Sequence, residues 1–458
     1  MKKHYQLAVI GSGSGGREAA FVAAQNGLKV LLIEKDTLGG TCLHRGCYSI
    51  RALRACAEAT KDGYQSSRFG IEITGAETGF EKWLTIQRRV SARLTQELKN
   101  QLERAGVEIR FAAASFAQAN ELCLRSSYGE IESIEADYII LATGSRPAFD
   151  ALDSYYVNSD ELLTWTAVPR HLLIVGGGYI GCEFASIFRS LGSTVTLVEK
   201  RKCLLADWEQ SLGDYIGANL RSAGVDVHLE REIVLSDPGQ AGQKPVFVLD
   251  GETEIAPDVV LVASGRKPNA EGLALERVGI HPNPFVAVDE QLRTACHPVF
   301  AVGDINGLSL LDSAAVVQAR IAVGAILGKK ERFSARWIPK CIHTDPVIAS
   351  IGWNEDEAGS AGVDAIAHSQ TFRLVTEDER TVVMPLPTMV KILIQAESRQ
   401  ILGVHVVGAQ AAEIVNLASL AVRAQFTLDQ LLQVPLVHPS ATEVFQECAK
   451  GIGKVEVG

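Results

Sequence analysis

The sequence predicts an α/β protein in which one strand–helix–strand unit occurs twice, followed by a separate C-terminal α+β unit. Residues 6–34 contain a short apolar strand, a glycine-rich turn, a helix and a second strand, and residues 172–199 repeat that order. Such short, continuously apolar strands are typical of a parallel sheet covered on both faces. The copies lie far apart in the chain, so we assign them to two separate domains.

Both turns have the glycine spacing of a dinucleotide-binding motif. Glycine allows a tight turn, close approach of the backbone to a pyrophosphate, and close packing of the following helix, whose free N–H groups attract phosphate. Glu34 and Glu199 end the second strand of each unit and can accept hydrogen bonds from a ribose. One such motif is weak, but its repetition predicts two Rossmann-like domains. The turn residues expected to contact nucleotide are Gly11, Gly13 and Gly16 in the first unit, and Gly176, Gly178, Ile180 and Gly181 in the second.

The acid in the second unit bears on the choice of nicotinamide cofactor. A carboxylate at Glu199 would repel a 2′-phosphate, which favours NAD over NADP. Three basic residues, Lys200, Arg201 and Lys202, follow directly and would tolerate a phosphate. We favour NAD.

Composition narrows the partners and the compartment. The 458 residues carry a net charge of −10, which disfavours nucleic acid as a partner. Nine cysteines form no dense framework, which favours a reducing compartment. No apolar run approaches the roughly 20 residues of a membrane span, and the run after the N-terminus is too short for a signal peptide. We therefore expect a soluble, cytoplasmic protein.

Cys42 and Cys47 follow the first nucleotide-binding unit directly. In a regular helix their Cα atoms would lie about 8 to 9 Å apart, whereas a disulfide needs less than about 7 Å. A bond between them therefore requires a distorted turn, which Gly46 permits. On spacing alone, two free buried cysteines explain the pair as well as a redox disulfide does, but the position after a dinucleotide motif favours the redox pair. The sequence has no CxxC pair of the kind that binds zinc, and we therefore expect no metal site.

Other segments have simpler interpretations. We expect a loop over residues 60–79, a helix over 80–105, strands over 390–394 and 401–407, and a helix near 411–424. The stripe of Val90, Leu94, Leu98 and Leu102 on the 80–105 helix is expected to pack in the core. A bare His-Pro is usually a turn, but His438 has Glu443 five residues later. A carboxylate that orients the imidazole would let it take a proton from a thiol.

With these motifs the chain resembles the FAD-dependent pyridine nucleotide–disulfide oxidoreductases, and most closely the dihydrolipoamide dehydrogenases. The resemblance runs from about residue 5 to residue 450 and includes Ala142–Pro147, Gly265–Asn269 and Phe300–Asp304. It implies the following division: 1–147, first part of an FAD-binding domain; 148–267, an NAD-binding domain; 268–336, second part of the FAD-binding or central domain; 337–458, a C-terminal dimerisation domain.

The resemblance also implies roles for single residues. Cys42 would exchange with substrate, and Cys47 would be the charge-transfer thiolate beside the flavin. His438, oriented by Glu443, would serve as acid and base for the cysteines of the partner subunit, which implies an obligate homodimer. Glu183 would lie between flavin and nicotinamide. The further residues expected at the cofactors are Gly40, Thr41, Arg51, Thr143, Gly144, Ser145, Asp304 and Asp312 for FAD, and Gly265 for NAD.

Four departures from the family pattern affect this site. Arg51 replaces the usual lysine, and we expect it to pair with Glu183 and shift the flavin potential. His44 replaces an asparagine, and Leu436 replaces a histidine. Asp312-Ser-Ala-Ala315 replaces the usual Ala-His-Lys-Ala. These changes bear on substrate and rate more than on fold.

The expected function is oxidation of a protein-bound dihydrolipoyl dithiol, on a lipoyl domain or lipoyl carrier protein, through Cys42–Cys47 and FAD, with hydride passing to NAD⁺. An alternative within the class is an NAD(P)H-dependent reductase of another disulfide or of a metal ion. An alternative of another class is a flavin-binding scaffold or redox sensor whose disulfide is vestigial.

Overall fold

The computed structural model describes residues 2–65, 80–150, 155–237, 245–249, 251, 253–373 and 387–452. The chain folds into two compact units. Unit 1 comprises residues 1–52, 81–148 and 265–335, and unit 2 comprises residues 53–80, 149–264 and 336–458. Among the described residues, no helix combines the length and the apolar character that crossing a membrane requires.

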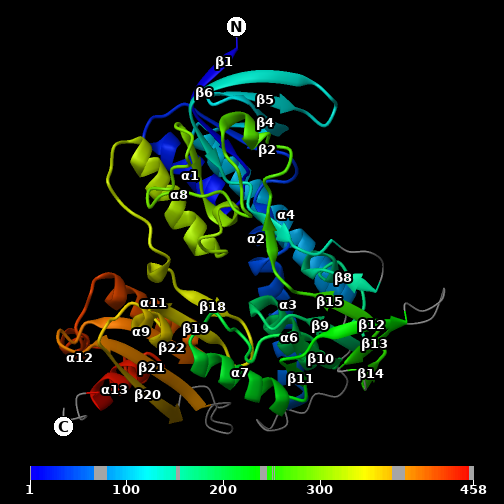
Figure 1. Ribbon diagram of the computed structural model, residues 1–458, viewed down its shortest axis with the longest axis vertical. Helices are drawn as coiled ribbons and strands as arrows, with labels where there is room; N and C mark the ends of the chain where they lie inside the picture. Colours follow the sequence, from blue (N-terminus) through cyan, green and yellow to red (C-terminus); the bar gives the residue numbers. More distant parts are fainter. Residues whose placement is uncertain are drawn as a thin grey trace. The chain divides into compact units, whose positions relative to one another are not determined.

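Unit 1 is built on a seven-stranded sheet with a parallel core (Figure 1). In spatial order its strands are β3 (Glu108–Phe111), β2 (Val30–Glu34), β1 (Lys3–Ile10), β6 (Ile131–Leu141), β5 (Glu121–Arg125) and β4 (Ala113–Gln118), and β17 (Val299–Ala301) pairs with β6. Strand β1 runs parallel to both neighbours, with Leu7 opposite Val30 and Tyr138. Every residue of β2 is buried, which accounts for its continuous apolar sequence up to Glu34.

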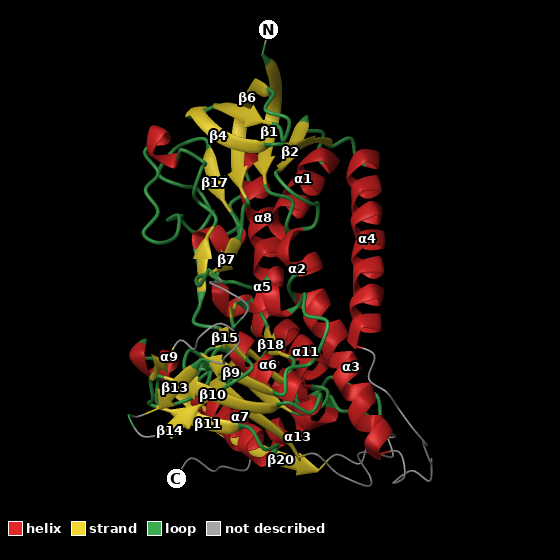
Figure 2. Ribbon diagram, turned by 90° about the vertical axis from the view of Figure 1, so that its right-hand side faces the viewer, coloured by secondary structure: helices red, strands yellow, loops and turns green. Residues whose placement is uncertain are grey.

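Two helices of unit 1, α1 (Ser14–Gln25) and α8 (Asp312–Ile326), pack side by side next to this sheet (Figures 1 and 2). Small buried residues on α1 permit the close approach, since a Cβ on Gly15 would lie 3.3 Å from the Ala315 carbonyl oxygen. The other elements of this unit are α2 (Gly40–His44), the start of α3 (Cys47–Gln65), α4 (Phe80–Arg104) from residue 81, β7 (Ser145–Pro147), β16 (Arg266–Pro268), and the 3₁₀ turns η2 (Leu275–Val278), η3 (Gly303–Asn306) and η4 (Ala335–Trp337) at the boundary with unit 2.

Helix α4 confirms the helix predicted over residues 80–105, but its apolar stripe is covered only in part. Leu98 and Leu102 are buried, whereas Val90 is 48% exposed. The prediction that Val90 packs in the core is therefore wrong. The predicted loop over 60–79 is also wrong at its start, because α3 continues to Gln65; residues 66–79 lie outside the described residues.

Unit 2 contains a second parallel sheet, with strands in the order β11 (Asp226–Leu229), β10 (Thr194–Glu199), β9 (His171–Val175), β15 (Val259–Val262) and β8 (Tyr156–Val157). Strand β9 leads through the second glycine turn into α6 (Tyr179–Ser190), as the repeat predicts. The accompanying elements are α5 (Ser159–Leu162), α7 (Gln210–Ser222) and an antiparallel sheet of β12 (Ile233–Asp237), β13 (Val246–Leu249) and β14 (Thr253–Ile255).

The C-terminal part of unit 2 is an antiparallel sheet in the order β18 (Lys340–Ile342), β19 (Ile348–Gly352), β22 (Ile401–Val407), β21 (Pro387–Gln395) and β20 (Ala365–Arg373). Its helices are α9 (Glu355–Ser360), α11 (Ala411–Arg423), α12 (Leu428–Leu432) and α13 (Glu443–Ile452). Buried side chains of β21, β22, α11 and α13 form one apolar core. Both predicted strands and the helix near 411–424 are thereby confirmed.

The units divide the chain near the boundaries predicted from sequence, at residues 148, 265 and 335. The segments predicted to be the NAD-binding and dimerisation domains both fall in unit 2. The four-part division itself stays a prediction.

Within unit 2, a buried ion pair links the residue before α7 to the C-terminal antiparallel sheet. The Lys391 ammonium on β21 contacts Glu209 Oε1, just before α7, at 2.7 Å, and also contacts Glu355. Beside it lies His405, which is 1% exposed. Its Nε2 donates to the Trp353 carbonyl oxygen at 3.0 Å, so its Nδ1, 2.7 Å from Ser350 Oγ, is the acceptor. Burial lowers the pKa of His405 to about 4, and the charges of Lys391 and Lys340 act in the same direction, opposed by Glu209.

We predict an acid-dependent loss of stability from His405. Because its pKa lies below the ordinary value, the unfolded chain binds one more proton than the folded chain between these two values, and stability falls as the pH is lowered through that window. His405→Gln retains hydrogen-bonding groups but removes the titration. Relative to the variant, the native protein should lose about 3 kcal/mol of unfolding free energy between roughly pH 7 and pH 4. Denaturant unfolding of both proteins measures this change. A difference that stays constant over this range would contradict the prediction.

Candidate functional site

The segment that carries the two cysteines is an interrupted helix. Helix α2 ends at His44, Arg45 adopts φ −137° and ψ 13°, and α3 begins at Cys47. A Cβ on Gly46 would lie 3.2 Å from the Cα of Cys42 and 3.1 Å from the carbonyl oxygen of Thr41. The chain therefore turns back on itself at a position that favours glycine, and the predicted distorted turn is confirmed.

Hydrogen bonds within unit 1 hold this turn in place. Ser91 Oγ, on α4, donates to the Leu43 carbonyl oxygen at 3.1 Å, and Ser49 Oγ donates to the His44 carbonyl oxygen at 2.9 Å. The imidazole of His44 reaches back, with Nε2 2.8 Å from the Leu38 carbonyl oxygen. His44, which departs from the family pattern, therefore anchors the turn to the segment before it.

Cys42 and Cys47 are free thiols in the structure and interact through a hydrogen bond between their side chains. That hydrogen bond is the largest influence that raises the pKa of Cys42, followed by burial. Because these influences favour the protonated form of Cys42, we expect the charge of a singly ionised pair on Cys47. Cys47 is exposed and is the first residue of α3, where the helix dipole favours negative charge. The disulfide between them stays a prediction.

A carboxylate lies beside this pair. Asp312, at the start of α8, interacts with Cys42 both as a charge and through a side-chain hydrogen bond, and raises the pKa of Cys42 further. The Ser14 hydroxyl contacts the Asp312 carboxylate. A Cβ on Gly40 would lie 2.7 Å from the Cα of Gly13, so α2 begins against the turn that carries Ser14. Cys42 and Asp312 thus meet at the first glycine turn.

That turn has the form of a phosphate cradle. The φ angle of Gly11 is +100°, and a Cβ on Gly16 would lie only 1.9 Å from the Gly11 carbonyl oxygen. A Cβ on Gly13, by contrast, would meet no protein atom within 4 Å, and no side chain caps the N-terminus of α1. The second turn repeats these features at Gly176, Gly181 and Gly178. Both turns therefore fit a pyrophosphate, as FAD in unit 1 and NAD in unit 2 would require.

The acids of the two repeats occupy equivalent places. Glu34 accepts hydrogen bonds from the backbone N–H groups of Ser12 and Asp36, both at 2.9 Å. Glu199 accepts hydrogen bonds from the backbone N–H groups of Gly177, at 2.5 Å, and of Arg201, at 2.8 Å. In unit 1 the Ser12 hydroxyl also donates to Glu34, at 2.6 Å, and accepts from Gly39. Sequence reasoning missed Ser12, although it stands between the first two glycines of the motif.

The remaining residues predicted to contact FAD come together around Ser145. Its hydroxyl donates to Asp304 Oδ2 at 2.5 Å and accepts from Arg266 Nε at 2.7 Å. Burial raises the pKa of Asp304, opposed by Ser145 and Arg266. Thr143 Oγ1 donates to the Asn269 carbonyl oxygen at 2.8 Å. Gly144 has a φ of +69°, and its α-carbon is open to a ligand. Thr41 lies on α2, and Gly265, predicted to contact NAD, belongs to unit 1.

Glu183 and Ile180 lie on α6 of unit 2. The Glu183 carboxylate accepts a hydrogen bond from the His343 backbone N–H at 2.8 Å. Desolvation raises the pKa of Glu183 to about 7, opposed by that hydrogen bond and by the charge of Arg54. Arg51 is exposed and belongs to unit 1, whereas Glu183 belongs to unit 2, so their pairing stays a prediction.

The proposed acid–base pair is formed within a single chain. His438 Nδ1 lies 2.8 Å from Glu443 Oε1, while the side chain of His438 is 82% exposed. The hydrogen bond with His438 lowers the pKa of Glu443, with help from the Ser440 backbone N–H. The carboxylate fixes the hydrogen-bonding role of Nδ1 and leaves Nε2 available as a proton acceptor.

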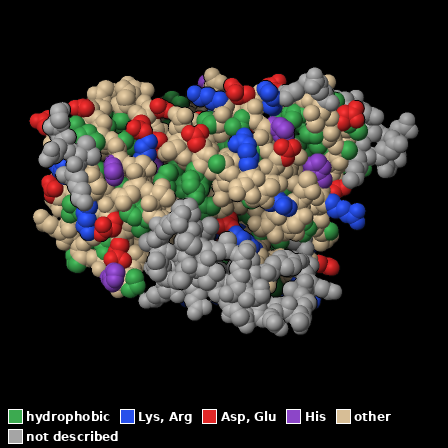
Figure 3. Space-filling model, turned by 90° about the horizontal axis from the view of Figure 1, so that it is seen from below, with side chains coloured by type: hydrophobic (Ala, Val, Ile, Leu, Met, Phe, Trp, Pro, Cys, Tyr) green, Lys and Arg blue, Asp and Glu red, His purple; other side chains and the backbone are tan. Residues whose placement is uncertain are grey.

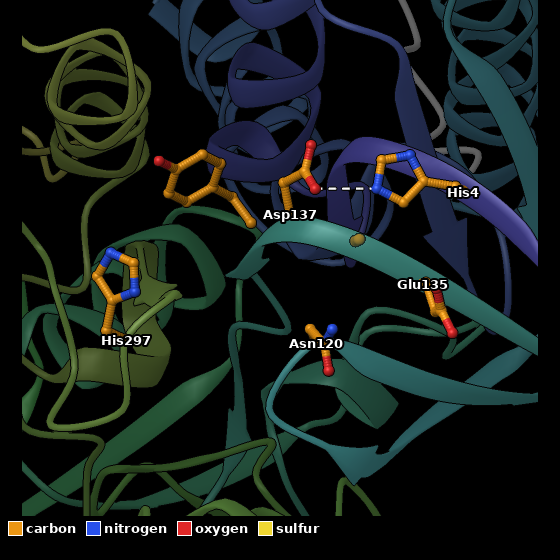
Figure 4. A pocket seen from close by; sticks show the side chains of 7 residues that line it. His4, Asn120, Glu135, Asp137 and His297 are labelled. Atoms are coloured by element: carbon orange, nitrogen blue, oxygen red, sulfur yellow. Dashed lines mark hydrogen bonds and ion pairs between the residues drawn. The ribbon is translucent and has the colours of Figure 1, made fainter.

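A surface pocket in unit 1 lies apart from the predicted site. His4, Asn120, Glu135, Asp137 and His297 surround it, and His4 Nε2 pairs with Asp137 at 2.9 Å (Figure 4). It contains none of the predicted site residues. Within the described ranges, no group of three or more His, Cys, Asp or Glu side chains is arranged to hold a metal ion. Acidic and basic side chains are intermixed over the described part of the face in Figure 3.

Comparisons with known proteins agree with this geometry. A family profile described as pyridine nucleotide-disulphide oxidoreductase matches residues 5–324, and one for the dimerisation domain of such enzymes matches residues 338–449. A dihydrolipoyl dehydrogenase of Bacillus subtilis is 31% identical over 96% of this chain and 97% of its own. A glutathione reductase of Burkholderia cepacia is 30% identical over 97% of this chain and 98% of its own.

Solved structures show the same fold. The flavoprotein disulfide reductase RclA of Escherichia coli, as a Cu(II) complex, has a TM-score of 0.85 at 24% identity and covers 99% of this chain and 100% of its own. LpdA of Mycobacterium tuberculosis has a TM-score of 0.89 at 23% identity and covers 98% of this chain and 99% of its own.

We predict that alanine at the open glycine of each turn weakens the binding of a different cofactor. Gly13→Ala should fold normally, since its Cβ meets no protein atom, but should weaken FAD binding by ~10-fold or more, about 1.4 kcal/mol. Gly178→Ala should keep its FAD and weaken NADH binding to a similar degree. FAD content of the purified protein and fluorescence titration with NADH measure the two effects. Full FAD content in Gly13→Ala would exclude this turn as the flavin nucleotide site.

Proposed function

Because the chain belongs to the pyridine nucleotide–disulfide oxidoreductases, which use FAD and NAD(H), we propose that it oxidises a protein-bound dihydrolipoyl dithiol and passes the electrons to NAD⁺. The observation that carries the proposal is the hydrogen-bonded pair of Cys42 and Cys47 at the first glycine turn. The proposed substrate is a dithiol on a lipoyl domain or lipoyl carrier protein, in line with relatives named dihydrolipoyl dehydrogenase.

The exchange uses the two sulfurs in different ways. A substrate thiolate attacks Cys42 of the oxidised pair, which forms a mixed disulfide and releases Cys47 as a thiolate. The second substrate thiolate then attacks the substrate sulfur of the mixed disulfide, which releases the oxidised substrate and displaces Cys42 as a thiolate. Cys42 then takes up one of the two protons that the substrate thiols gave to the base, and the other proton is released to solvent. Two electrons and one proton then reside on the cysteine pair. The high pKa of Cys42 supports this division, since it keeps the charge on Cys47.

The base for this exchange is proposed to come from a second copy of the chain. The exposed His438 of the partner subunit, oriented by its own Glu443, would remove the protons of the substrate thiols. The match of residues 338–449 to a dimerisation domain supports a homodimer. A cytoplasmic location is also proposed, because the nine cysteines form no dense disulfide framework.

Residues of both units would hold the cofactors. In unit 1 the turn at Gly13, Glu34 and Asp304 would bind FAD; in unit 2 the turn at Gly178 and Glu199 would bind NAD⁺. Bound FAD and NAD⁺ supply the hydride-transfer chemistry that reoxidises the dithiol. The protein's contribution is to place the thiolate, hold Cys42 protonated and position the carboxyl of Glu183.

A reductase acting on another disulfide is the second candidate, favoured by the glutathione reductase relative, which is as similar as the dehydrogenases. Steady-state rates with NAD⁺ and dihydrolipoamide, and with NADH or NADPH and lipoamide or glutathione disulfide, separate the two. Turnover with glutathione disulfide and none with lipoyl substrates would exclude the dehydrogenase.

We predict that the two cysteines give different spectra. On two-electron reduction the holoenzyme should develop a long-wavelength charge-transfer band, because the thiolate charge lies on Cys47. Cys47→Ser should abolish the band. Cys42→Ser should retain it, even without reductant, because Cys47 then has no partner sulfur. A flavin that bleaches without such a band in the native protein would instead favour a scaffold or sensor.

We also predict that Asp312 keeps Cys42 protonated. In the reduced protein, Asp312→Asn should shift the pH midpoint of Cys42 alkylation downward by about one unit, because an opposing charge is removed. Peptide mass spectrometry after timed alkylation measures each cysteine separately, and Cys56 serves as an internal reference. Ser14→Ala is the matched control, since it removes the hydroxyl that contacts Asp312 and keeps the carboxylate. An unchanged Cys42 profile in Asp312→Asn would refute this role.

A further inference from the structure

The loop after β18 is held by α6 from one side. Glu183 and Ser186 are three residues apart on that helix and so share a face. The Glu183 carboxylate accepts from the His343 backbone N–H at 2.8 Å, and Ser186 Oγ accepts from the Asp345 backbone N–H at 3.1 Å. The segment from His343 to Asp345 is therefore fixed to the N-terminal part of α6.

The part of α3 that lies in unit 2 holds the same loop. The Arg54 guanidinium donates to the carbonyl oxygen of Thr344, a fully buried residue, and Lys61, two helical turns further on, contacts the Asp345 carboxylate. Arg54 is also paired with Glu58 at 2.7 Å, and its side chain is only 15% exposed. The Glu183 carboxylate and the Arg54 guanidinium thus bind two adjacent residues, His343 and Thr344, of one short segment.

This placement puts a permanent positive charge near a carboxyl group that is otherwise disfavoured as an anion. Desolvation acts against the ionised form of Glu183, and the charge of Arg54 acts in its favour. The titratable or charged side chains on the elements around Glu183 include Cys182 and Arg189 on α6, Arg54, Cys56, Glu58 and Lys61 on α3, and Lys340, Cys341, His343 and Asp345 on β18 and the loop after it.

We propose that Arg54 is the positioning residue of Glu183, which it serves by fixing the loop at Thr344 and by supplying a positive charge that favours the ionised carboxylate. Sequence reasoning assigned this charge to Arg51, one helical turn earlier. In the structure Arg51 is exposed, whereas Arg54 is enclosed and bound to the loop that binds Glu183.

The consequence for the reaction rests on the proposed function and on the position between flavin and nicotinamide that the family resemblance implies for Glu183. With its pKa at about 7, Glu183 changes its charge within the working pH range. Arg54 would therefore set the pH at which the potential of the bound flavin responds to Glu183.

The test titrates the holoenzymes of Arg54→Met and Arg51→Met with pH and follows two signals. Infrared difference spectra report the carboxylic acid C=O stretch of Glu183, identified by its loss in Glu183→Gln. The midpoint potential of the flavin reports whether that carboxyl lies near the cofactor. Glu58→Gln is the matched control, since it removes the exposed partner of Arg54 and keeps the guanidinium.

Arg54→Met should raise the pH midpoint of the Glu183 band by about one unit, because loss of a nearby opposite charge favours the neutral acid. Arg54→Lys should restore much of that shift, and Glu58→Gln and Arg51→Met should leave the midpoint in place. Arg54→Gln, which keeps a donor for Thr344, serves as the second variant if the methionine form does not fold.

A midpoint that moves in Arg51→Met, or in neither arginine variant, overturns the proposal. A shift of the carboxyl band in Arg54→Met without any change in the pH dependence of the flavin potential supports the Arg54–Glu183 pair. That result would at the same time remove Glu183 from the flavin site, so the two proposals fail separately.

Discussion

The chemistry of this protein depends on a helix that stops between two cysteines. A continuous helix would hold the two Cα atoms about 8 to 9 Å apart, beyond the reach of a disulfide. The interruption after His44, with Gly46 packed against the Cα of Cys42, brings the two sulfurs into hydrogen-bonding contact. It also makes Cys47 the first residue of the next helix, so one backbone feature provides both proximity and a favourable field for a thiolate.

The two glycine turns share one local geometry, which fits a dinucleotide in each unit. Glu34 and Glu199 each accept a hydrogen bond from the backbone N–H two residues later in the chain. Each also accepts one from the backbone N–H of the second residue of the glycine turn in its own unit. The difference lies in the side chain at that second residue. Ser12 ties Glu34 to Gly39 at the start of the cysteine segment, whereas Gly177 has no side chain, and a Cβ there would lie 2.4 Å from Leu204. In unit 1 the glycine turn is thereby hydrogen-bonded to the segment that carries the two cysteines.

Features with a local cause could be predicted from the sequence. Glycine spacing, apolar strands and the need for a bend between Cys42 and Cys47 follow from short-range geometry, and the structure contains each of them. The contacts of Arg54 with Thr344 and of Asp312 with Ser14 join segments almost 300 residues apart, and no periodicity indicates such neighbours. Val90 shows the same limit, because a helical stripe gives direction but not how far the core extends along it.

The pair of His438 and Glu443 has a consequence for how two copies would come together. Its hydrogen bond is complete within one chain, although the imidazole is largely in contact with solvent. The tautomer of His438 is thus fixed before a second copy binds. The entropy lost in ordering the His438 side chain is therefore not added to the free-energy cost of association. In the proposed homodimer, assembly would join copies whose imidazoles are already oriented, and each copy would present a proton acceptor to the sulfurs of the other.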